Sequence, residues 1–391
     1  MLDAFDLDPS VTHLNHGSFG AVPRVVSEAQ RRVRDRAEAN PMRFFRVEAA
    51  GLKEAARHTA ADFLGVASDE IGLVRNVTQS ASTVLSSLAQ RGRLGAGDVV
   101  LLGRAGYESV RRSVAYWCER TGASYAVVDY PVDASPDDVV DAYRRGIEAA
   151  AGTPRLVVVD EITSPTGTVL PVREVAALAC AAGALSFVDG AHVPGHVRAA
   201  PREVGADFWT GTWHKWGFAP RGTTALWVTE EERAGIDPLT TSWNHGQPFP
   251  LPFDTHGTDD YSAWFTLGDA IAFWGEAGGL GIGERAMAML DTGAKVVGDA
   301  VGAPTVAVPR TPAPCLRLVP LPDGVATTED DADRLYEALS ARRVEAQVVA
   351  YDDRGWIRLS GAVYNEPADY ERLADVLPDV IPPGRHSSQK V

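Results

Sequence analysis

Between residues 74 and 228, short and continuous apolar runs alternate with alanine-rich segments that have a helical period. A strand that is apolar on both faces is typical of a parallel sheet with helices packed on each side. The sequence therefore predicts an α/β fold in which a mostly parallel sheet lies between helices. The expected strands are residues 99–102, 125–128, 156–159, 185–188 and 225–228.

The pattern changes after about residue 255. A helical connector over 262–300, broken by the glycines at 278–281, leads into a strand, a helix, two strands and a closing helix, which is typical of a small α+β domain. We expect a large domain over 15–260 and a small domain made of 1–14 and 261–381. The tail, 382–391, has proline, glycine and serine without an apolar period and is expected to be disordered. The expected C-terminal elements are the strands 316–319, 344–350 and 356–359 and the helices 328–342 and 367–377.

The charge and the cysteine content narrow the function classes. A formal net charge of −15 over 391 residues argues against a nucleic-acid partner, which needs clustered lysine and arginine. Cys118, Cys180 and Cys315 are far apart and form no CxxC pair, so neither a disulfide framework nor a metal site is expected. The first residues lack the basic and apolar parts of a signal peptide, and the longest nearly apolar stretch, 175–188, is shorter than the about 20 residues that span a bilayer. We therefore expect no membrane contact and a cytoplasmic location.

Lysine is rare in this chain. Lysine and arginine together number 37, of which only Lys53, Lys215, Lys295 and Lys390 are lysines. Lys215 lies in the segment DFWTGTWHKWGF (207–218), among aromatic side chains, where loss of hydration favours the neutral amine. A neutral amine is what Schiff-base chemistry requires, although a lysine can also extend from an aromatic face to water.

Two further segments bear on the chemistry. Asp189 closes the apolar run FVD (187–189), and the ligands of open parallel sheets collect at the carboxyl ends of strands. The alternative is that Asp189 only caps the next helix. The segment NVTQSAS (76–82) stands between an expected strand at 71–74 and a helical run to residue 89, where free N–H groups and hydroxyls can hold an anion. Any helix start rich in serine and threonine has this appearance.

Together these three segments match the needs of one cofactor. Pyridoxal 5'-phosphate (PLP) requires an amine for its aldehyde, an anion beside its ring nitrogen and a site for its phosphate. Lys215, Asp189 and the segment 76–82 would supply them in that order. The sequence therefore indicates a PLP enzyme.

The chain also resembles a known family, the fold-type I PLP enzymes of aminotransferase class V, and within it the isopenicillin N epimerase-like branch. The matching segments follow the family's order and cover the chain almost from end to end. The resemblance implies a large domain with the cofactor and a smaller α+β C-terminal domain. The segments are NHGSFG (15–20), NVTQSAS (76–82), VDEITSPTGTVLPVRE (159–174), VDGAHVPG (188–195), ADFWTGTWHKW (206–216), APRGTTALWV (219–228), GTDDYSAW (257–264) and IRLSGAVYNEPADYERL (357–373).

The resemblance implies roles around the cofactor. Lys215 would form the Schiff base and later carry the proton of the substrate α-carbon, and Asp189 would pair with the ring nitrogen. The other implied cofactor contacts are His192 near the ring hydroxyl, Thr78 and Gln79 at the phosphate with Thr212 and His214 nearby, Tyr107 stacked on the ring, and Ser164 where relatives often have an asparagine that touches the ring oxygen.

Other implied roles concern the substrate and the assembly. Arg358 matches the arginine that binds the substrate α-carboxylate, for which a guanidinium fork is suited. Asn15 and His16 would line the substrate side of the site. The loop with Gly257 and Thr258 matches one that reaches the phosphate of a neighbouring subunit, which implies a homodimer with shared active sites.

Three readings of the reaction follow from the resemblance. The first is an epimerase-like enzyme that removes and returns the α-proton of an amino acid or a peptide-like substrate. The second is a C–S β-lyase or a decarboxylating deaminase that acts on an S-conjugated cysteine in natural-product biosynthesis of the lincosamide type. The third is a catalytically idle PLP-fold binding protein. A persulfide-forming cysteine desulfurase is not expected, because the region around 342–344, where such enzymes carry a loop cysteine, has none.

Overall fold

The computed structural model describes residues 1–303 and 308–381. Its larger sheet has seven strands in the order β2-β8-β7-β6-β5-β3-β4. Strands β3 to β7 are parallel, whereas β8 is antiparallel to both β7 and β2. The strands are β2 (Ile71–Val74), β3 (Asp98–Gly103), β4 (Ser124–Val128), β5 (Thr153–Asp160), β6 (Leu185–Gly190), β7 (Phe208–Thr212) and β8 (Thr224–Val228).

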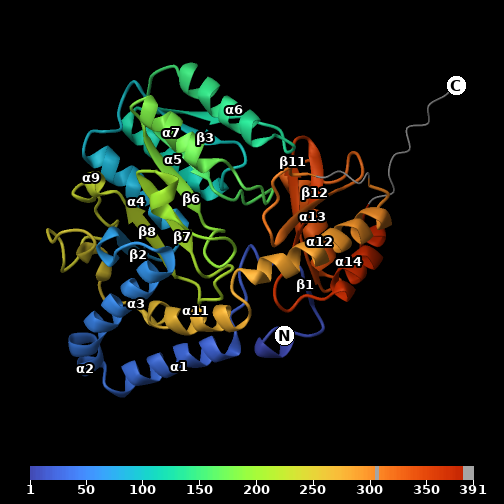
Figure 1. Cartoon of the computed structure of the whole chain (residues 1–391), viewed down its shortest axis with the longest axis horizontal. Helices are drawn as coiled ribbons and strands as arrows, with labels where there is room; N and C mark the ends of the chain where they lie inside the picture. Colours follow the sequence, from blue (N-terminus) through green and yellow to red (C-terminus); the bar gives the residue numbers. More distant parts are fainter. Residues whose placement is uncertain (304–307, 382–391) are drawn as a thin grey trace.

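Each central strand is apolar on both faces because it is buried on both. In β5, Leu156 and Val158 join one hydrophobic cluster, together with residues of α4 and α5, whereas Val157 and Val159 join a second cluster on the opposite face. The alternation follows from the two-residue period of a strand. The mostly parallel α/β architecture is thus as expected (Figure 1). The helices of this part are α1 (Arg24–Ala39), α2 (Pro41–Arg43), α3 (Ala49–Leu64), α4 (Val77–Gln90), α5 (Glu108–Thr121), α6 (Pro136–Glu148), α7 (Val172–Ala181), α8 (Pro201–Val204) and α9 (Glu230–Arg233).

Two details of the sheet differ from the expectation. The segment 225–228 is a strand, but it runs antiparallel to its neighbours. Strand β7 was not expected, because its sequence FWTGT carries polar residues on alternate positions; those residues are nevertheless buried, and the strand extends the parallel part of the sheet.

The C-terminal part has its own three-stranded antiparallel sheet, in the order β11-β12-β9, which lies beside α12, α13 and α14 (Figure 1). The expected connector is three helices, and the left-handed Gly278 and Gly279 separate the second from the third. The expected strand 344–350 is divided into β10 and β11 at Ala346. The elements are α10 (Ser262–Phe265), α11 (Leu267–Glu276), α12 (Gly281–Ala300), β9 (Leu316–Pro320), α13 (Glu329–Ser340), β10 (Val344–Glu345), β11 (Gln347–Tyr351), β12 (Arg354–Ser360) and α14 (Pro367–Val380).

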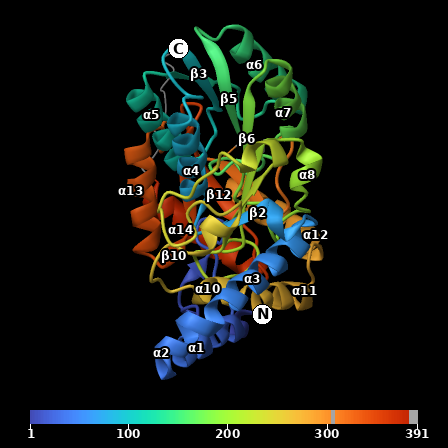
Figure 2. The ribbon, with the colours of Figure 1, turned by 90° about the vertical axis from the view of Figure 1, so that its left-hand side faces the viewer.

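The N-terminal residues lie with this C-terminal part. Strand β1 (Thr12–His13) pairs in parallel with β10. This is the pairing expected if residues 1–14 belong to the small domain, and the exact division of the domains stays a prediction. Figure 2 shows α1 and α2 extending at one end of the molecule. The predicted disordered tail, 382–391, lies outside the described residues.

The described residues contain neither a membrane-spanning helix nor a cluster of metal ligands. None of the helices within 1–303 and 308–381 combines the length and apolar character needed to cross a membrane. The same residues contain no group of three or more histidine, cysteine, aspartate or glutamate side chains placed to hold a metal ion.

Candidate active site

The candidate site forms where β5, β6 and β7 end. Asp160, Asp189 and Thr210 are paired in register across these three parallel strands. They continue the alternate positions whose apolar members face α4 and α5, and the Thr210 hydroxyl lies 2.7 Å from the Ser80 hydroxyl of α4. A row of buried polar groups therefore marks the carboxyl end of the sheet, where ligands bind in open α/β folds.

Lys215 lies in the turn between β7 and β8, next to the buried Trp213 and Trp216. Burial lowers the pKa of its amine from 10.5 to about 8, with Arg358 acting in the same direction and Asp189 and Asp160 opposing it. The neutral amine is therefore accessible near neutral pH, as a Schiff-base lysine requires. This is the chemistry that the aromatic surroundings predicted.

His192 fixes the proton arrangement around this amine. The indole N–H of Trp216 donates to His192 Nδ1 at 3.2 Å, and His192 Nε2 lies 3.0 Å from Lys215 Nζ. An indole nitrogen can only donate, so the proton of the neutral imidazole is on Nε2, and the Lys215 amine accepts it when the amine is in its neutral form. Burial and the nearby Lys215 lower the pKa of His192 well below its ordinary value, which keeps the ring neutral. His192 thus presents a hydrogen-bond donor to the site, as contact with a ring hydroxyl would need.

The two carboxylate oxygens of Asp189 differ in their hydrogen bonding. Its Oδ1 accepts the backbone N–H of Ala191 at 2.9 Å, in a turn rather than at a helix start, so the helix-cap alternative does not apply. Its Oδ2 is buried and has no hydrogen-bond partner among the described residues. Burial raises the pKa of this carboxyl. A buried, unpartnered carboxylate oxygen is what the protonated ring nitrogen of PLP pairs with, so the site fits the cofactor.

The start of α4 offers a place for the phosphate. Asn76 caps this helix by accepting the backbone N–H of Gln79 at 2.8 Å. The N–H groups of Val77 and Thr78 have no partner among the described residues, and the Thr78 hydroxyl lies 3.0 Å from that of Ser109. The Gln79 side chain instead accepts the backbone N–H of Arg75 at 2.9 Å. Gln79 therefore completes the helix cap, and Thr78 is the better placed of the two predicted phosphate contacts.

Thr212 and His214 lie together at the end of β7. The Thr212 hydroxyl donates to the Thr223 carbonyl at 2.9 Å and lies 2.7 Å from His214 Nδ1. Because the Thr212 hydroxyl proton is donated to the Thr223 carbonyl, the hydroxyl oxygen accepts a hydrogen bond from His214 Nδ1. The neutral His214 ring therefore carries its proton on Nδ1. Burial lowers the pKa of His214 to about 4.

Arg358 lies on β12 and is buried, with 3% of its surface exposed. Its Nη2 donates to Asn15 Oδ1 at 3.0 Å and to the Ser18 hydroxyl at 2.9 Å, and its Nη1 donates to the backbone carbonyl of Ser164. Its Nε is buried without a partner in the described part of the chain. Burial lowers the pKa of Arg358 to about 10, so the side chain is still a cation at neutral pH. A buried cation with an unused donor is suited to a carboxylate ligand.

The neighbours of Arg358 include one predicted residue and two that were not predicted. The Ser164 carbonyl accepts from Arg358, and the Ser164 hydroxyl makes no hydrogen bond within the described residues, so its predicted contact with the cofactor stays a prediction. Ser18 and Gln347 were not expected: Gln347 Oε1 accepts from Asn15 Nδ2 at 3.1 Å and from the Ser18 hydroxyl at 3.4 Å. Nothing in the local sequence pattern marks these contacts, since their partners are more than 300 residues apart.

His16 joins the N-terminal loop to the lysine turn. Its Nε2 lies 2.9 Å from the Lys215 carbonyl oxygen and its Nδ1 lies 3.0 Å from the Tyr364 hydroxyl. Burial lowers the pKa of His16 to about 4. Both ring nitrogens are therefore occupied on a neutral ring, and His16 positions the loop rather than exchanging protons.

Tyr107 precedes α5, and 41% of its surface is exposed. The described structure records no side-chain hydrogen bond for it. Its backbone N–H lies beside the carboxyl of Asp160. The sequence patterns did not lead us to predict a role for Asp160. It ends the apolar run VVVD (157–160) as Asp189 ends its own apolar run, and this similarity could have indicated it.

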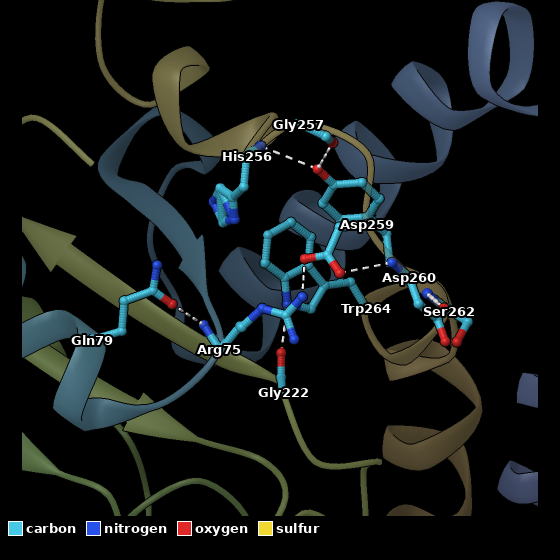
Figure 3. A network of polar contacts seen from close by, with 10 residues as sticks. Arg75, Gln79, Gly222, His256, Gly257, Asp259, Asp260, Ser262 and Trp264 are labelled. Carbon is cyan, nitrogen blue, oxygen red and sulfur yellow. Dashed lines mark hydrogen bonds and ion pairs between the residues drawn. The ribbon is translucent and has the colours of Figure 1, made fainter. Parts of the chain in front are cut away.

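The loop with Gly257 and Thr258 is fixed at both ends (Figure 3). The Tyr261 hydroxyl donates to the Gly257 carbonyl at 2.7 Å and accepts the His256 N–H at 3.1 Å. Asp259 forms an ion pair with Arg75, directly before α4. Thr258 itself makes no hydrogen bond to the other candidate residues within the described structure.

A second lysine has similar acidity. Lys53 on α3 is buried, its Nζ lies 3.7 Å from the centre of the Tyr261 ring, and burial lowers its pKa to about 8. Its polar neighbours are Thr255, at 3.4 Å from Nζ, and Asp254, which is already paired with Arg57. The groups that act on Lys215 are instead Asp189, Asp160 and Arg358, so the surroundings and not the acidity distinguish the two lysines.

The fold and the site together define a PLP-dependent enzyme of fold type I. The family model "Aminotransferase class-V" matches residues 18–299, and the chain belongs to this family. Its cofactor is pyridoxal 5'-phosphate.

Comparison with curated proteins finds relatives with two kinds of activity. A putative L-cysteine desulfhydrase of Oryza sativa subsp. japonica is 31% identical, over 98% of this chain and 86% of the relative. The isopenicillin N epimerase of Streptomyces clavuligerus is 30% identical, over 95% of each chain. Among solved structures, a complex of the cystine C–S lyase C-DES with cysteine persulfide superposes with a TM-score of 0.77 at 20% identity, over 96% of this chain and 99% of that one. The last similarity concerns the fold.

Proposed function

We propose that this protein is a C–S β-lyase that releases a thiol from cysteine or an S-substituted cysteine, with Lys215 as its only proton carrier. One observation supports this most: on the substrate side, Lys215 is the one candidate residue with a pKa near neutrality. Arg358 is a permanent donor, Asn15 does not ionise, and both ring nitrogens of His16 are bonded.

β-Elimination needs only one such group. PLP, when bound, withdraws electrons from the α-carbon and so acidifies its proton. Arg358 would hold the α-carboxylate, which fixes the α-carbon near Lys215. Lys215 takes the α-proton, the Cβ–S bond breaks with its electron pair on sulfur, and the thiolate takes up a proton. For cysteine, addition of one water gives pyruvate, ammonia and hydrogen sulfide in equal amounts.

Epimerisation is the second candidate. It is supported by the near full-length similarity to isopenicillin N epimerase. It requires a proton to reach the α-carbon from the opposite face, which needs a second acid or a large movement of the substrate. None of the three substrate-side residues just described is such an acid.

Product analysis separates the two reactions. The purified protein is incubated in deuterated water with L-cysteine, S-methyl-L-cysteine and L-alanine, with the variant Lys215→Ala as control. β-Elimination predicts pyruvate and a thiol from the first two substrates and none in the control. Recovery of the D-amino acid with deuterium at the α-carbon, without pyruvate, would instead establish the epimerase.

We also propose that no protein persulfide forms, so the sulfur leaves as a free thiol. Cys118 and Cys315 are buried, and burial raises the pKa of Cys118 to about 11 and that of Cys315 to about 12. Cys180 is exposed but lies on α7, and segment 342–344 has no cysteine. Thiolate formation, which sulfur transfer needs, is thus disfavoured at both buried positions.

We further propose a homodimer with shared sites. Thr258 sits on a braced loop yet makes no hydrogen bond to the other candidate residues within 1–303 and 308–381, which suits a role in a partner's phosphate site. Trp243 is 91% exposed and Phe19 76% exposed, apolar surface that a second copy would cover. Light scattering after size exclusion tests this, and a monomer with full activity would refute it.

A further inference from the structure

Asp160 is the least explained group of the site. It is 5% exposed and lies beside Asp189 in register on the neighbouring parallel strand. Side chains at paired positions of neighbouring parallel strands point to the same face, so the two carboxyl groups are neighbours. Both lie on the face that α4 and α5 cover.

The groups that face Asp160 come from several elements. From β6 it faces Asp189, and from the turn after β7 it faces Lys215. The phenols of Tyr130 and Tyr143 also lie within electrostatic range of Asp160, and burial raises the pKa of each phenol. The backbone N–H of Tyr107 lies beside the same carboxyl.

The N–H beside Asp160 belongs to Tyr107, the residue predicted to stack on the cofactor ring. At Gly106, a Cβ would lie 3.4 Å from Asp160 Oδ1 and only 2.9 Å from the Gly103 carbonyl oxygen, so the chain here passes close over the carboxyl. Tyr107, the N-cap residue of α5, follows immediately. Its backbone N–H is therefore placed to donate to an acceptor at Asp160.

Two adjacent buried carboxyl groups do not both ionise readily. Lys215 is the nearest cation, and its own burial favours the neutral amine. Burial and the neighbouring Asp189 raise the pKa of Asp160 well above its ordinary value. Asp189 accepts a backbone N–H, which favours its ionised form.

We propose that Asp160 is a positioning residue of the cofactor site, which remains protonated beside an ionised Asp189 and holds the backbone N–H of Tyr107. A protonated carboxyl still accepts a hydrogen bond through its carbonyl oxygen. The pair then carries one negative charge, on the side chain whose free oxygen meets the ring nitrogen. This inference concerns the cofactor and holds for either reaction proposed above.

Two substitutions test the two parts of the inference. Asp160→Asn is neutral and keeps a carbonyl oxygen for Tyr107, whereas Asp160→Leu is neutral and has no acceptor. We expect the Kd of the apoprotein for PLP to stay within about threefold in Asp160→Asn and to rise about tenfold or more in Asp160→Leu, since the second variant leaves the Tyr107 N–H without its acceptor. Equal Kd values for the two variants would refute the role of the Tyr107 contact. A Kd for Asp160→Asn raised as far as that of Asp189→Asn would refute a neutral Asp160.

Infrared spectroscopy of the apoprotein tests the protonation state of Asp160, and it requires neither PLP nor a folded Asp160→Leu variant. At neutral pH the wild-type spectrum should contain the C=O stretching band of a protonated carboxylic acid. That band should be absent from Asp160→Asn and present in Asp189→Asn. If Asp160→Asn loses carboxylate bands and keeps the carboxylic acid band, Asp160 is ionised in the wild type, and the inference is wrong.

Discussion

Replacing Lys215 by methionine in the apoprotein tests the electrostatics of the site without any catalysis. Burial lowers the pKa of this amine from 10.5 to about 8. At about 1.4 kcal/mol per pKa unit, keeping the lysine charged in the folded state costs up to about 3 kcal/mol of stability. Methionine has a similar length and no charge, so Lys215→Met should stabilise the apoprotein by up to that amount at neutral pH.

The sign and the pH range of this effect follow from the direction of the shift. The folded state binds the lysine proton less tightly than the unfolded state does. The cost is therefore full below about pH 8 and fades as the pH rises through 10.5, where both states lose the proton. Above that pH range, the free energies of unfolding of wild type and variant should differ only through the packing of the side chain.

Urea unfolding of the two apoproteins at several pH values measures this difference. Lys295→Met is the matched control, because Lys295 is exposed on α12 and pairs with Asp299. The control should show no stabilisation that fades with rising pH. A difference between Lys215→Met and wild type that is constant from neutral to alkaline pH would refute a neutralised amine at this position.

Three other predictions follow from the same contacts. Arg358→Ala should raise KM by about 100-fold or more, because it leaves a substrate carboxylate without its charged partner; Arg358→Lys should recover only part of this loss, and unchanged KM values would place the carboxylate elsewhere. Tyr261→Phe removes the hydroxyl that holds both His256 and Gly257, so we expect weaker PLP binding in the dimer, measured by dialysis; Tyr336→Phe on α13, which removes a hydroxyl that donates to Glu345, is the control. Cys180→Ser should leave thiol release unchanged, and intact-protein mass spectrometry during turnover should show no added sulfur; a species heavier by one sulfur atom would contradict the proposed free-thiol product.

The sequence predicted those parts of the fold and site whose signal is local. The strands that are buried on both faces are continuous apolar runs, and Asp189 and Lys215 stand out because each has a distinctive immediate environment. β7 was missed because its buried threonines look like loop residues until Ser80 and the Thr223 carbonyl are seen to pair with them.

Contacts between distant segments could not be predicted in this way. Arg358 meets Asn15, Ser18 and Ser164, which come from widely separated parts of the chain. The tautomer of His192 follows from an indole N–H that sequence spacing does not reveal as its partner. The run VVVD (157–160) could have marked Asp160 as a carboxyl at a strand end, but its pairing with Asp189 depends on strand order, which is a property of the folded sheet.

The central claim is that Lys215, and no other lysine, carries the cofactor. Borohydride reduction of the PLP-loaded protein, followed by peptide mapping, tests it directly because reduction makes the Schiff-base linkage permanent. We expect the reduced cofactor to be attached to the peptide that contains Lys215, in about one copy per chain. Attachment to Lys53, whose pKa is also lowered to about 8, or no attachment at all, would contradict it.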